Sequence, residues 1–331
     1  MIVVVCLNPA LDITHHVPRV DWAGVNQPTA VYARPGGKGA NVARTQNSFG
    51  IKVLLTGLAG GTTGTAVEAG LLQLGVPAAF TPAGGETRRT FSVVDDRGTV
   101  ALFNEPGPRV SAAEFERFLV GYGEALERAS VVVLSGSLPQ GLPPAAYAEL
   151  IAAATAAGVP AVLDTSGHAL REGVTAGPAI VKPNLDELAA LAGRSLRTPD
   201  DGIDLSAVTA AAVGLRTAGA RAVVASLGPD GLVAVTEDGC WQARPRAAVA
   251  GNATGAGDAV TAALAHGLLL GRAWPERLAH AAALGAATVA APVAGEFSYA
   301  DYEDGVDSVT VSQLPDAVAW LATGTHAEGV R

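Results

Sequence analysis

Short apolar runs rich in β-branched residues alternate along the chain with longer stretches of helical spacing. The first run, Ile2 to Leu7, ends at Asn8-Pro9, which is typical of a strand buried on both faces. We expect strands at 2–7, 52–58, 78–80, 131–134, 161–164, 179–182, 222–226, 232–235 and 241–243, and helices at 62–74, 111–128, 144–157, after Asn184, at 204–218 and at 259–270. This alternation predicts an α/β fold: a mainly parallel sheet with helices on both faces, and ligands beyond the carboxyl ends of the strands.

Two early strand pairs interrupt the alternation. One consists of 12–17 and 29–33, and the other is a hairpin of 88–94 and 99–104 that turns at Asp95 to Gly98. They predict a small β lid, formed by roughly 12–34 and 88–104 as insertions in one domain over 1–325. We interpret 296–307 as acidic and irregular and 309–321 as a strand and a helix, and we expect 326–331 to be a flexible tail.

Charge and composition exclude several classes of partner. The formal net charge is -9 and no Lys/Arg-rich run occurs, which argues against binding to nucleic acid. The opening apolar run is too short to span a bilayer, so no membrane partner is expected. Cys6 and Cys240 are too few for a disulfide framework and lie in no metal-binding pattern, which fits a cytoplasmic protein.

The segment Gly251 to Asp258 is the first candidate for chemistry, because it runs directly into the apolar helix predicted from Ala259 onward. Its glycines allow a tight turn, and the amides at a helix N-terminus attract a phosphate. Asp258 can accept a proton from a hydroxyl aimed at that phosphate. On these residues alone, an ordinary helix start with a first-turn acid is an equally good interpretation.

Pro35 to Ala43 forms a second glycine-rich turn into a helix, and it contains Lys38, one of only three lysines. It lacks the P-loop spacing, and neither glycine-rich turn has the GxGxxG fingerprint, so a Rossmann oxidoreductase is disfavoured. Ser135, Ser137 and Asp164 lie in no GxSxG elbow, so a hydrolase triad is disfavoured as well.

Taken together and in order, several short motifs resemble those of the PfkB sugar kinases of the ribokinase superfamily. They are Asn8-Pro9-Ala10-Leu11-Asp12, the Gly37 segment, Ser135-Gly136-Ser137-Leu138-Pro139, Lys182-Pro183-Asn184-Leu185-Asp186-Glu187, Ser226-Leu227-Gly228 and the Gly255 segment. The first two look most similar to the branch of 1-phosphofructokinase and tagatose-6-phosphate kinase. The resemblance implies a ribokinase-like three-layer fold, ATP and Mg²⁺ as cofactors, and a homodimer formed through the β lid.

The resemblance also implies which residues hold a ketohexose that already carries a phosphate. Asp12, Gly37 and Asn41 would contact the sugar, and a plain turn is the alternative role for Asp12. Lys38, Arg88 and the Ser137 hydroxyl would hold the phosphate, with Arg89 as a further candidate cation. Thr90 departs from the asparagine that relatives often have there, and no basic residue occurs over 99–104.

On the nucleotide side, the resemblance implies that Asn184 and Glu187 order Mg²⁺, partly through water, although the same pair is a good helix cap. The residues implied to contact ATP are Lys182, Asn184, Glu187, Ser226, Gly228, Gly231 and Thr254, with 286–295 bordering the adenine. Asp258 would be the base, and the amides of Gly255, Ala256 and Gly257 would stabilise the transferred group.

The sequence therefore predicts ATP-dependent phosphorylation of a ketohexose phosphate, with fructose 1-phosphate as the expected substrate. Tagatose 6-phosphate and fructose 6-phosphate are the alternatives, because C1 and C6 flank a ketofuranose ring almost symmetrically. A nucleoside or free-sugar kinase is less well supported, since Lys38 and Arg88 would lack an anionic partner. A non-catalytic sugar-phosphate sensor is the alternative from another class.

Overall fold

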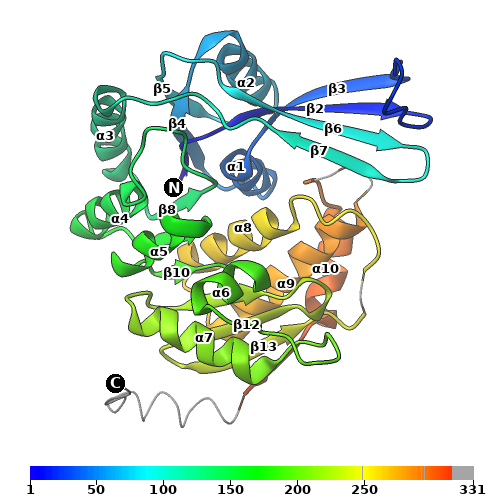
Figure 1. Cartoon of the computed structure of the whole chain (residues 1–331). Helices are drawn as coiled ribbons and strands as arrows, with labels where there is room; N and C mark the ends of the chain where they lie inside the picture. Colours follow the sequence, from blue (N-terminus) through cyan, green and yellow to red (C-terminus); the bar gives the residue numbers. More distant parts are fainter. Residues whose placement is uncertain (248, 292, 294, 315–331) are drawn as a thin grey trace. The chain divides into compact units, whose positions relative to one another are not determined.

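The computed structural model describes residues 1–247, 249–291, 293 and 295–314. The chain forms two compact units (Figure 1). Unit 1 comprises Met1–Ala129 and Ser135–Pro143, and unit 2 comprises Ser130–Leu134 and Pro144–Arg331. Most of the predicted strands and helices are present, and they confirm an α/β fold with a mostly parallel main sheet flanked by helices.

Unit 1 contains three parallel strands. β1 (Ile2–Cys6) pairs with β4 (Val53–Ala59), which pairs with β5 (Ala78–Pro82). The helices of this unit are α1 (Lys38–Ser48), α2 (Gly61–Gln73) and α3 (Ala112–Leu126). All five residues of β1 are buried, as its continuous β-branched run predicts. Because α1 contacts β1 and β4, its first turn lies near the end of β1.

The two interrupting strand pairs form one four-stranded sheet within unit 1. Its strand order is β3 (Ala30–Gly36), β2 (Ala10–Val17), β6 (Arg88–Asp95) and β7 (Val100–Asn104). β2 pairs with β3 antiparallel and with β6 in parallel, so β2 is an inner strand (Figure 1). In the predicted turn, Asp95 Oδ1 accepts hydrogen bonds from the N–H of Arg97 at 3.0 Å and of Thr99 at 2.8 Å.

The strands of unit 2 are arranged in the order β14-β13-β12-β11-β10-β9-β8. The strands are β8 (Val131–Ser135), β9 (Ala161–Asp164), β10 (Ile180–Val181), β11 (Val223–Ser226), β12 (Leu232–Thr236), β13 (Gly239–Arg244) and β14 (Thr310–Gln313). β9, β10 and β11 run parallel, whereas β11 to β14 form an antiparallel meander. The parallel strands therefore end at one common edge.

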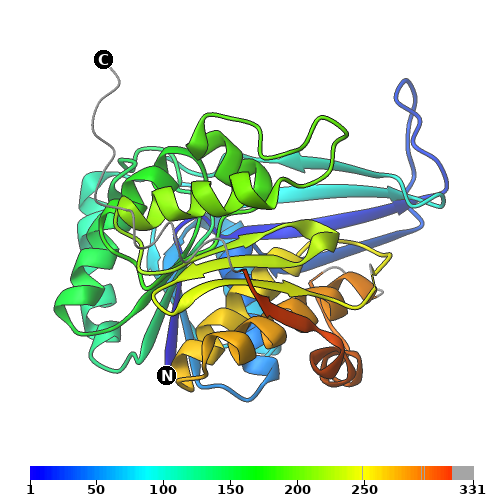
Figure 2. The same cartoon turned by 90° about the horizontal axis from the view of Figure 1, so that it is seen from below.

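Helices cover both faces of the unit 2 sheet. They are α4 (Ala146–Ala156), α5 (Gly167–Thr175), α6 (Leu185–Ala192), α7 (Leu205–Thr217), α8 (Ala256–Leu269), α9 (Trp274–Ala290) and α10 (Tyr299–Ser308). α7 contacts β11 and β12, whereas α9 contacts β12, β13 and β14, and Figure 2 shows these two helices on opposite sides of the strands. Leu188, Val208, Leu227 and Val233 belong to one buried cluster that joins α6 and α7 to the sheet.

The C-terminal part of the chain corrects the sequence interpretation. Of residues 296–307, only 296–298 are irregular, because α10 covers the rest and is capped by the Ser298 hydroxyl, which accepts a hydrogen bond from the N–H of Asp301 at 3.2 Å. α5 and α9 were also missed. In α9, buried residues occur almost all round the helix and many are alanines, so the sequence shows no contrasting polar face. Of the segment 309–321, β14 is described, whereas the predicted helix and the tail 326–331 lie outside the described residues.

Neither cysteine is bonded, and no described helix could cross a membrane. Cys6 and Cys240 are both buried free thiols. Within residues 1–314, apart from the gaps noted above, no helix combines the length and the apolar character that a bilayer requires.

Candidate active site

Asp12 lies against the first glycine-rich turn in unit 1. A β-carbon on Gly36 would collide with the Asp12 carboxylate, and Gly37 has φ +89°, which only glycine adopts readily. Burial raises the pKa of the Asp12 carboxyl, while a hydrogen bond from Thr90 and the charges of Arg88 and Arg44 act in the opposite direction. A half-buried carboxylate surrounded by cations and donors is suited to accept hydrogen bonds from sugar hydroxyls.

The predicted phosphate ligands gather beside this carboxylate. Arg88 donates from Nε to the Asn8 main-chain oxygen at 3.2 Å and from Nη1 to Thr90 Oγ1 at 3.4 Å. Asn8 in turn donates from Nδ2 to Ser137 Oγ at 3.2 Å. A β-carbon on Gly136 would lie 3.9 Å from Lys38 Cβ, so the Ser137 turn also approaches the start of α1. All six predicted sugar-side residues therefore lie in unit 1.

Arg89 does not join this group. Side chains alternate along a strand, so Arg89 points to the face opposite Arg88, where it pairs with Glu105 at 2.8 Å and lies over the ring of Phe91. This pair raises the pKa of Arg89 and lowers the pKa of Glu105 through hydrogen bonds and charge. The sequence interpretation of Arg89 as a further phosphate cation is therefore not supported by its position.

Two other arginines lie on the Asp12 side and were not predicted. Arg34 occupies the β3 position directly opposite Asp12, and so shares its face of the sheet. Arg44 lies one turn after Asn41 on α1, and its Nη1 is 3.5 Å from Asn41 Oδ1. The spacing of Lys38, Asn41 and Arg44 places all three on one face of the helix, a signal that the sequence carried.

In unit 2, the second glycine-rich turn forms the N-terminus of α8. Gly255 is the cap residue, with φ +87°, and a β-carbon there would lie 2.6 Å from Gly295 Cα. The N–H of Ala256 donates to the Ala253 oxygen at 3.2 Å, whereas no hydrogen bond among the described residues uses the N–H of Gly255 or Gly257. Asp258 lies in the first turn and is 7% exposed. Of the three predicted amides, two thus have no hydrogen-bond acceptor among the described residues and can receive an anion.

A buried ion pair lies next to this helix start. Lys182 Nζ is 3.5 Å from Asp164 Oδ1, and the two side chains are 3% and 0% exposed. Thr261 on α8 donates to Asp164 Oδ2 at 2.8 Å. A β-carbon on Gly257 would lie 3.7 Å from Lys182 Nζ, so the ammonium group is adjacent to the turn. Asp164 and Thr261 lie 97 positions apart, and no local pattern linked them in the sequence.

Asn184 and Glu187 form a reciprocal cap on α6. Asn184 Oδ1 accepts a hydrogen bond from the Glu187 N–H at 2.8 Å, and Glu187 Oε2 accepts one from the Asn184 N–H at 2.9 Å. Among the described residues, no group of three or more His, Cys, Asp or Glu side chains could hold a metal ion. The pair therefore fits Mg²⁺ that keeps most of its water ligands, rather than a cage made of protein atoms.

The other predicted nucleotide contacts lie near this cap and the α8 turn. The Ser226 N–H donates to the Pro183 oxygen at 3.0 Å, which places the end of β11 beside Asn184. Gly228 begins a 3₁₀ turn and Gly231 follows its last residue. The Leu227 N–H donates to the Gly231 oxygen at 2.8 Å. The Thr254 oxygen accepts a hydrogen bond from the Gly295 N–H at 3.1 Å. Residues 292 and 294 of the predicted adenine border lie outside the described residues.

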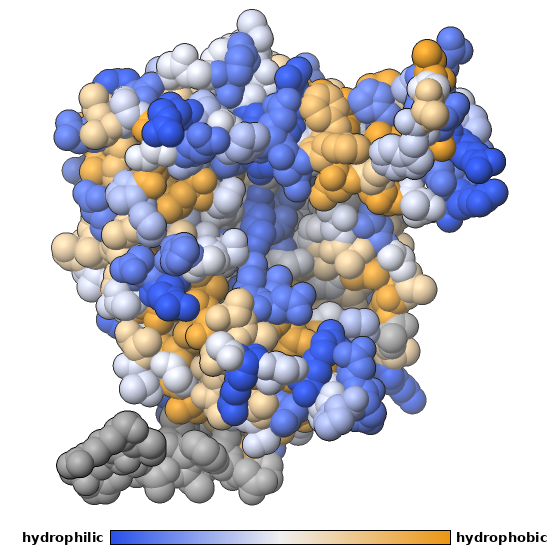
Figure 3. Space-filling view, in the orientation of Figure 1, coloured by the Kyte–Doolittle hydropathy of each residue, from blue (hydrophilic) through white to orange (hydrophobic). Residues whose placement is uncertain are grey.

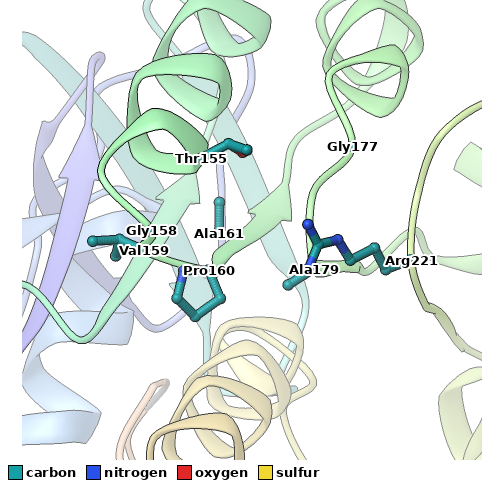
Figure 4. A pocket seen from close by; sticks show the side chains of 8 residues that line it. All are labelled: Thr155, Gly158, Val159, Pro160, Ala161, Gly177, Ala179 and Arg221. Atoms are coloured by element: carbon teal, nitrogen blue, oxygen red, sulfur yellow. The ribbon is translucent and has the colours of Figure 1, made fainter.

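A surface hollow of about 340 Å³ lies elsewhere in unit 2. It is lined by Thr155, Gly158, Val159, Pro160, Ala161, Gly177, Ala179 and Arg221 (Figure 4). These residues lie at the start of β9 and just before β10 and β11. The candidate site residues of unit 2 that adjoin this sheet lie instead at the carboxyl ends of its parallel strands. Arg221 is the one charged side chain among those that line it, so the hollow has little with which to perform catalysis.

Comparison with known proteins identifies the family of the chain. Residues 6–299 match the model of the pfkB family carbohydrate kinases. Phosphofructokinase-2 from Escherichia coli, in a complex with potassium, is 31% identical, with a TM-score of 0.84 over 92% of this chain and 98% of that chain. Its complex with fructose-6-phosphate gives a TM-score of 0.82 at the same identity and coverage.

A more distant structure supports the fold. It comes from Thermotoga maritima and is described as a "Possible 1-phosphofructokinase"; it is 24% identical, with a TM-score of 0.83 over 95% of this chain and 99% of that chain. The ribokinase-like fold expected from the sequence is thereby confirmed. The chain belongs to the pfkB family of carbohydrate kinases and is an ATP-dependent kinase.

Proposed function

We propose that this kinase transfers the γ-phosphoryl group of ATP to a hydroxyl of a ketohexose phosphate, with fructose 1-phosphate as the expected substrate and fructose 1,6-bisphosphate as the product. The observation that carries the proposal is the cluster of cations around Asp12. Arg88 and Arg44 act on its carboxylate, and Arg34 and Lys38 lie on the same strand pair and helix. These cations outnumber the single carboxylate, and a phosphate on the substrate would balance the excess positive charge, whereas a free sugar would not.

The residues of unit 2 supply the groups that phosphoryl transfer needs. The acceptor oxygen bonds to the γ-phosphorus, the bond to the bridging oxygen of ADP breaks, and the hydroxyl proton passes to Asp258. The uncommitted amides of Gly255 and Gly257, together with the Lys182 ammonium beside them, stabilise negative charge on the transferred group. Asn184 and Glu187 would hold Mg²⁺ through water, and the bound ion would supply positive charge to neutralise the nucleotide phosphates.

Fructose 6-phosphate and tagatose 6-phosphate are the alternative substrates. One phosphate subsite and one base can serve a 1-phosphate that reacts at O6 or a 6-phosphate that reacts at O1. The phosphofructokinase-2 complex with fructose-6-phosphate supports these alternatives. An ADP-release assay with fructose 1-phosphate, fructose 6-phosphate, tagatose 6-phosphate and free fructose decides among them. Fastest release with fructose 1-phosphate is expected, and release that no sugar stimulates would support the non-catalytic sensor instead.

Arg88 and Arg89 offer a matched test of the phosphate subsite, because they are neighbours on opposite faces of β6. Arg88→Ala is expected to raise KM for the sugar phosphate about tenfold or more, since a hydrogen bond to a charged group contributes about 1.5–3 kcal/mol. Arg89→Ala, which removes the exposed pair with Glu105, is expected to change KM less than about twofold. Steady-state kinetics at saturating ATP measures both, and equal effects would contradict the assignment.

We further propose that the protein is a homodimer joined through the four-stranded sheet. Val31, Tyr32, Val100, Leu102 and Phe103 on this sheet are each more than half exposed, and Figure 3 shows hydrophobic surface over it at the upper right. These side chains lie on β3 and β7, the two edge strands of the sheet, and exposed apolar edge strands favour pairing with a partner. Light scattering at micromolar concentration is expected to give the mass of a dimer, and a monomer would count against the proposal. The free buried cysteines and the use of ATP support a cytoplasmic location.

A further inference from the structure

Asn8, the second residue after β1, is 6% exposed and has a fixed amide orientation. Its Nδ2 donates to the Pro106 main-chain oxygen at 3.3 Å and to Ser137 Oγ at 3.2 Å. A carbonyl oxygen can only accept a hydrogen bond, so the amide nitrogen must be the atom that faces Pro106. Both N–H groups of the amide are thus committed, one of them to the Ser137 hydroxyl.

This arrangement determines where the Ser137 proton can point. A serine hydroxyl has one proton and two lone pairs. Because one lone pair accepts from Asn8, the O–H bond is turned away from the amide. Ser137 is exposed, so its proton can be donated to a ligand. The same residue fixes Arg88, whose Nε donates to the Asn8 main-chain oxygen at 3.2 Å. Two donors for one anion are therefore oriented by a single residue.

The surroundings of Asn8 are shaped to keep its side chain in this position. Gly107 has φ +88°, and a β-carbon there would overlap the Asn8 side chain. Among the described residues, Asn8 Oδ1 is buried and has no hydrogen-bond partner. An unsatisfied buried acceptor costs stability. That cost is explained if the Asn8 amide serves to donate its two hydrogen bonds, rather than only to stabilise the fold.

We propose that Asn8 is the positioning residue of the phosphate subsite: it orients the Ser137 hydroxyl toward the phosphate of the sugar without touching the substrate itself. The inference rests on the proposed function, since it assumes a phosphorylated sugar. The main-chain contact with Arg88 survives any substitution of Asn8, so a side-chain variant isolates the effect that passes through Ser137.

Calorimetric binding without nucleotide tests the proposal. Dissociation constants of fructose 1-phosphate, fructose 6-phosphate, tagatose 6-phosphate and fructose are measured for the wild type, Asn8→Ala, Ser137→Ala and the double variant. Asn8→Ala is expected to weaken binding of the preferred phosphosugar about tenfold, to leave fructose binding unchanged, and to add less than about twofold in the Ser137→Ala background. Asn47→Ala, which removes a similar amide bond to the Leu74 oxygen, is the matched control and is expected to change nothing.

The possible outcomes distinguish a positioning role from a structural one. Equal weakening of fructose and phosphosugar binding, or full additivity with Ser137→Ala, would show a merely structural role and overturn the inference. If Asn8→Ala does not fold, Asn8→Leu, which has a similar volume but neither an N–H donor nor a charge, is compared in the same way. Wild-type protein that binds no phosphosugar better than fructose would overturn the proposed function and the inference together, whereas binding without phosphoryl transfer would overturn only the function.

Discussion

Replacing Asp258 by asparagine is expected to lower kcat by at least about 100-fold, the low end for loss of a general base. The residue lies in the first turn of α8 and is nearly buried, next to the uncommitted amides of Gly255 and Gly257. An asparagine fills the same space but cannot take the proton. Binding of the sugar should survive, because the predicted sugar ligands lie in unit 1.

Steady-state kinetics with both substrates varied measures this effect. Asp301→Asn is the control, because Asp301 is likewise an acid in the first turn of a helix, but it is exposed and lies on α10. This control should change kcat by less than about twofold. If the Asp258→Asn variant turned over at a rate close to the wild type, Asp258 could not be the base.

Replacing Asp164 by alanine is expected to destabilise the protein by about 3–5 kcal/mol, the usual result of removing one partner of a buried ion pair. Lys182 would lose the carboxylate with which it pairs, and Thr261 would keep only the Gly257 oxygen as an acceptor. Denaturant unfolding gives the free energy directly. The variant should also have lower activity, since both partners adjoin the helix start that carries Asp258.

Two further variants separate charge from packing at this site. Arg244→Ala, which removes an exposed pair with Asp230 at 3.1 Å, should cost less than about 1 kcal/mol. Asp164→Ala combined with Lys182→Met removes both charges, and should recover part of the lost stability but not the activity. If the single Asp164→Ala variant were as stable as Arg244→Ala, the buried pair would contribute no more to the free energy of unfolding than an exposed pair does.

Local signals in the sequence predicted much of the fold. Ser111 and Glu114, at the capping-box spacing, do form a reciprocal cap on α3, and the run Ala161 to Asp164 is a buried strand with those bounds. α9 and α10 were not predicted, because the first is buried nearly all round and the second has one buried side chain, Tyr302, and four acidic residues among its ten. Neither helix has the apolar stripe that a sequence pattern reveals.

The arrangement of the candidate site depends on contacts between different elements, which no local sequence pattern reveals. Arg88 and Arg89 are chemically alike, and only the pairing of β6 with β2 and β7 shows which of them shares a face with Asp12. Thr90, a departure from the family pattern in the sequence, hydrogen-bonds both Arg88 and Asp12. Asp164 is the last residue of a predicted strand. Its partners, Lys182 just after β10 and Thr261 on α8, lie farther along the chain. Each of these contacts is set by strand order and register.

Direct observation of phosphoryl transfer tests the central claim most sharply. Wild-type protein is incubated with ATP, Mg²⁺ and fructose 1-phosphate, and the reaction is followed by phosphorus NMR. The account predicts that ADP and fructose 1,6-bisphosphate appear in equal amounts, with no inorganic phosphate formed in step with them. ATP that stays intact with each of the three sugar phosphates, or that yields only inorganic phosphate, would contradict the claim.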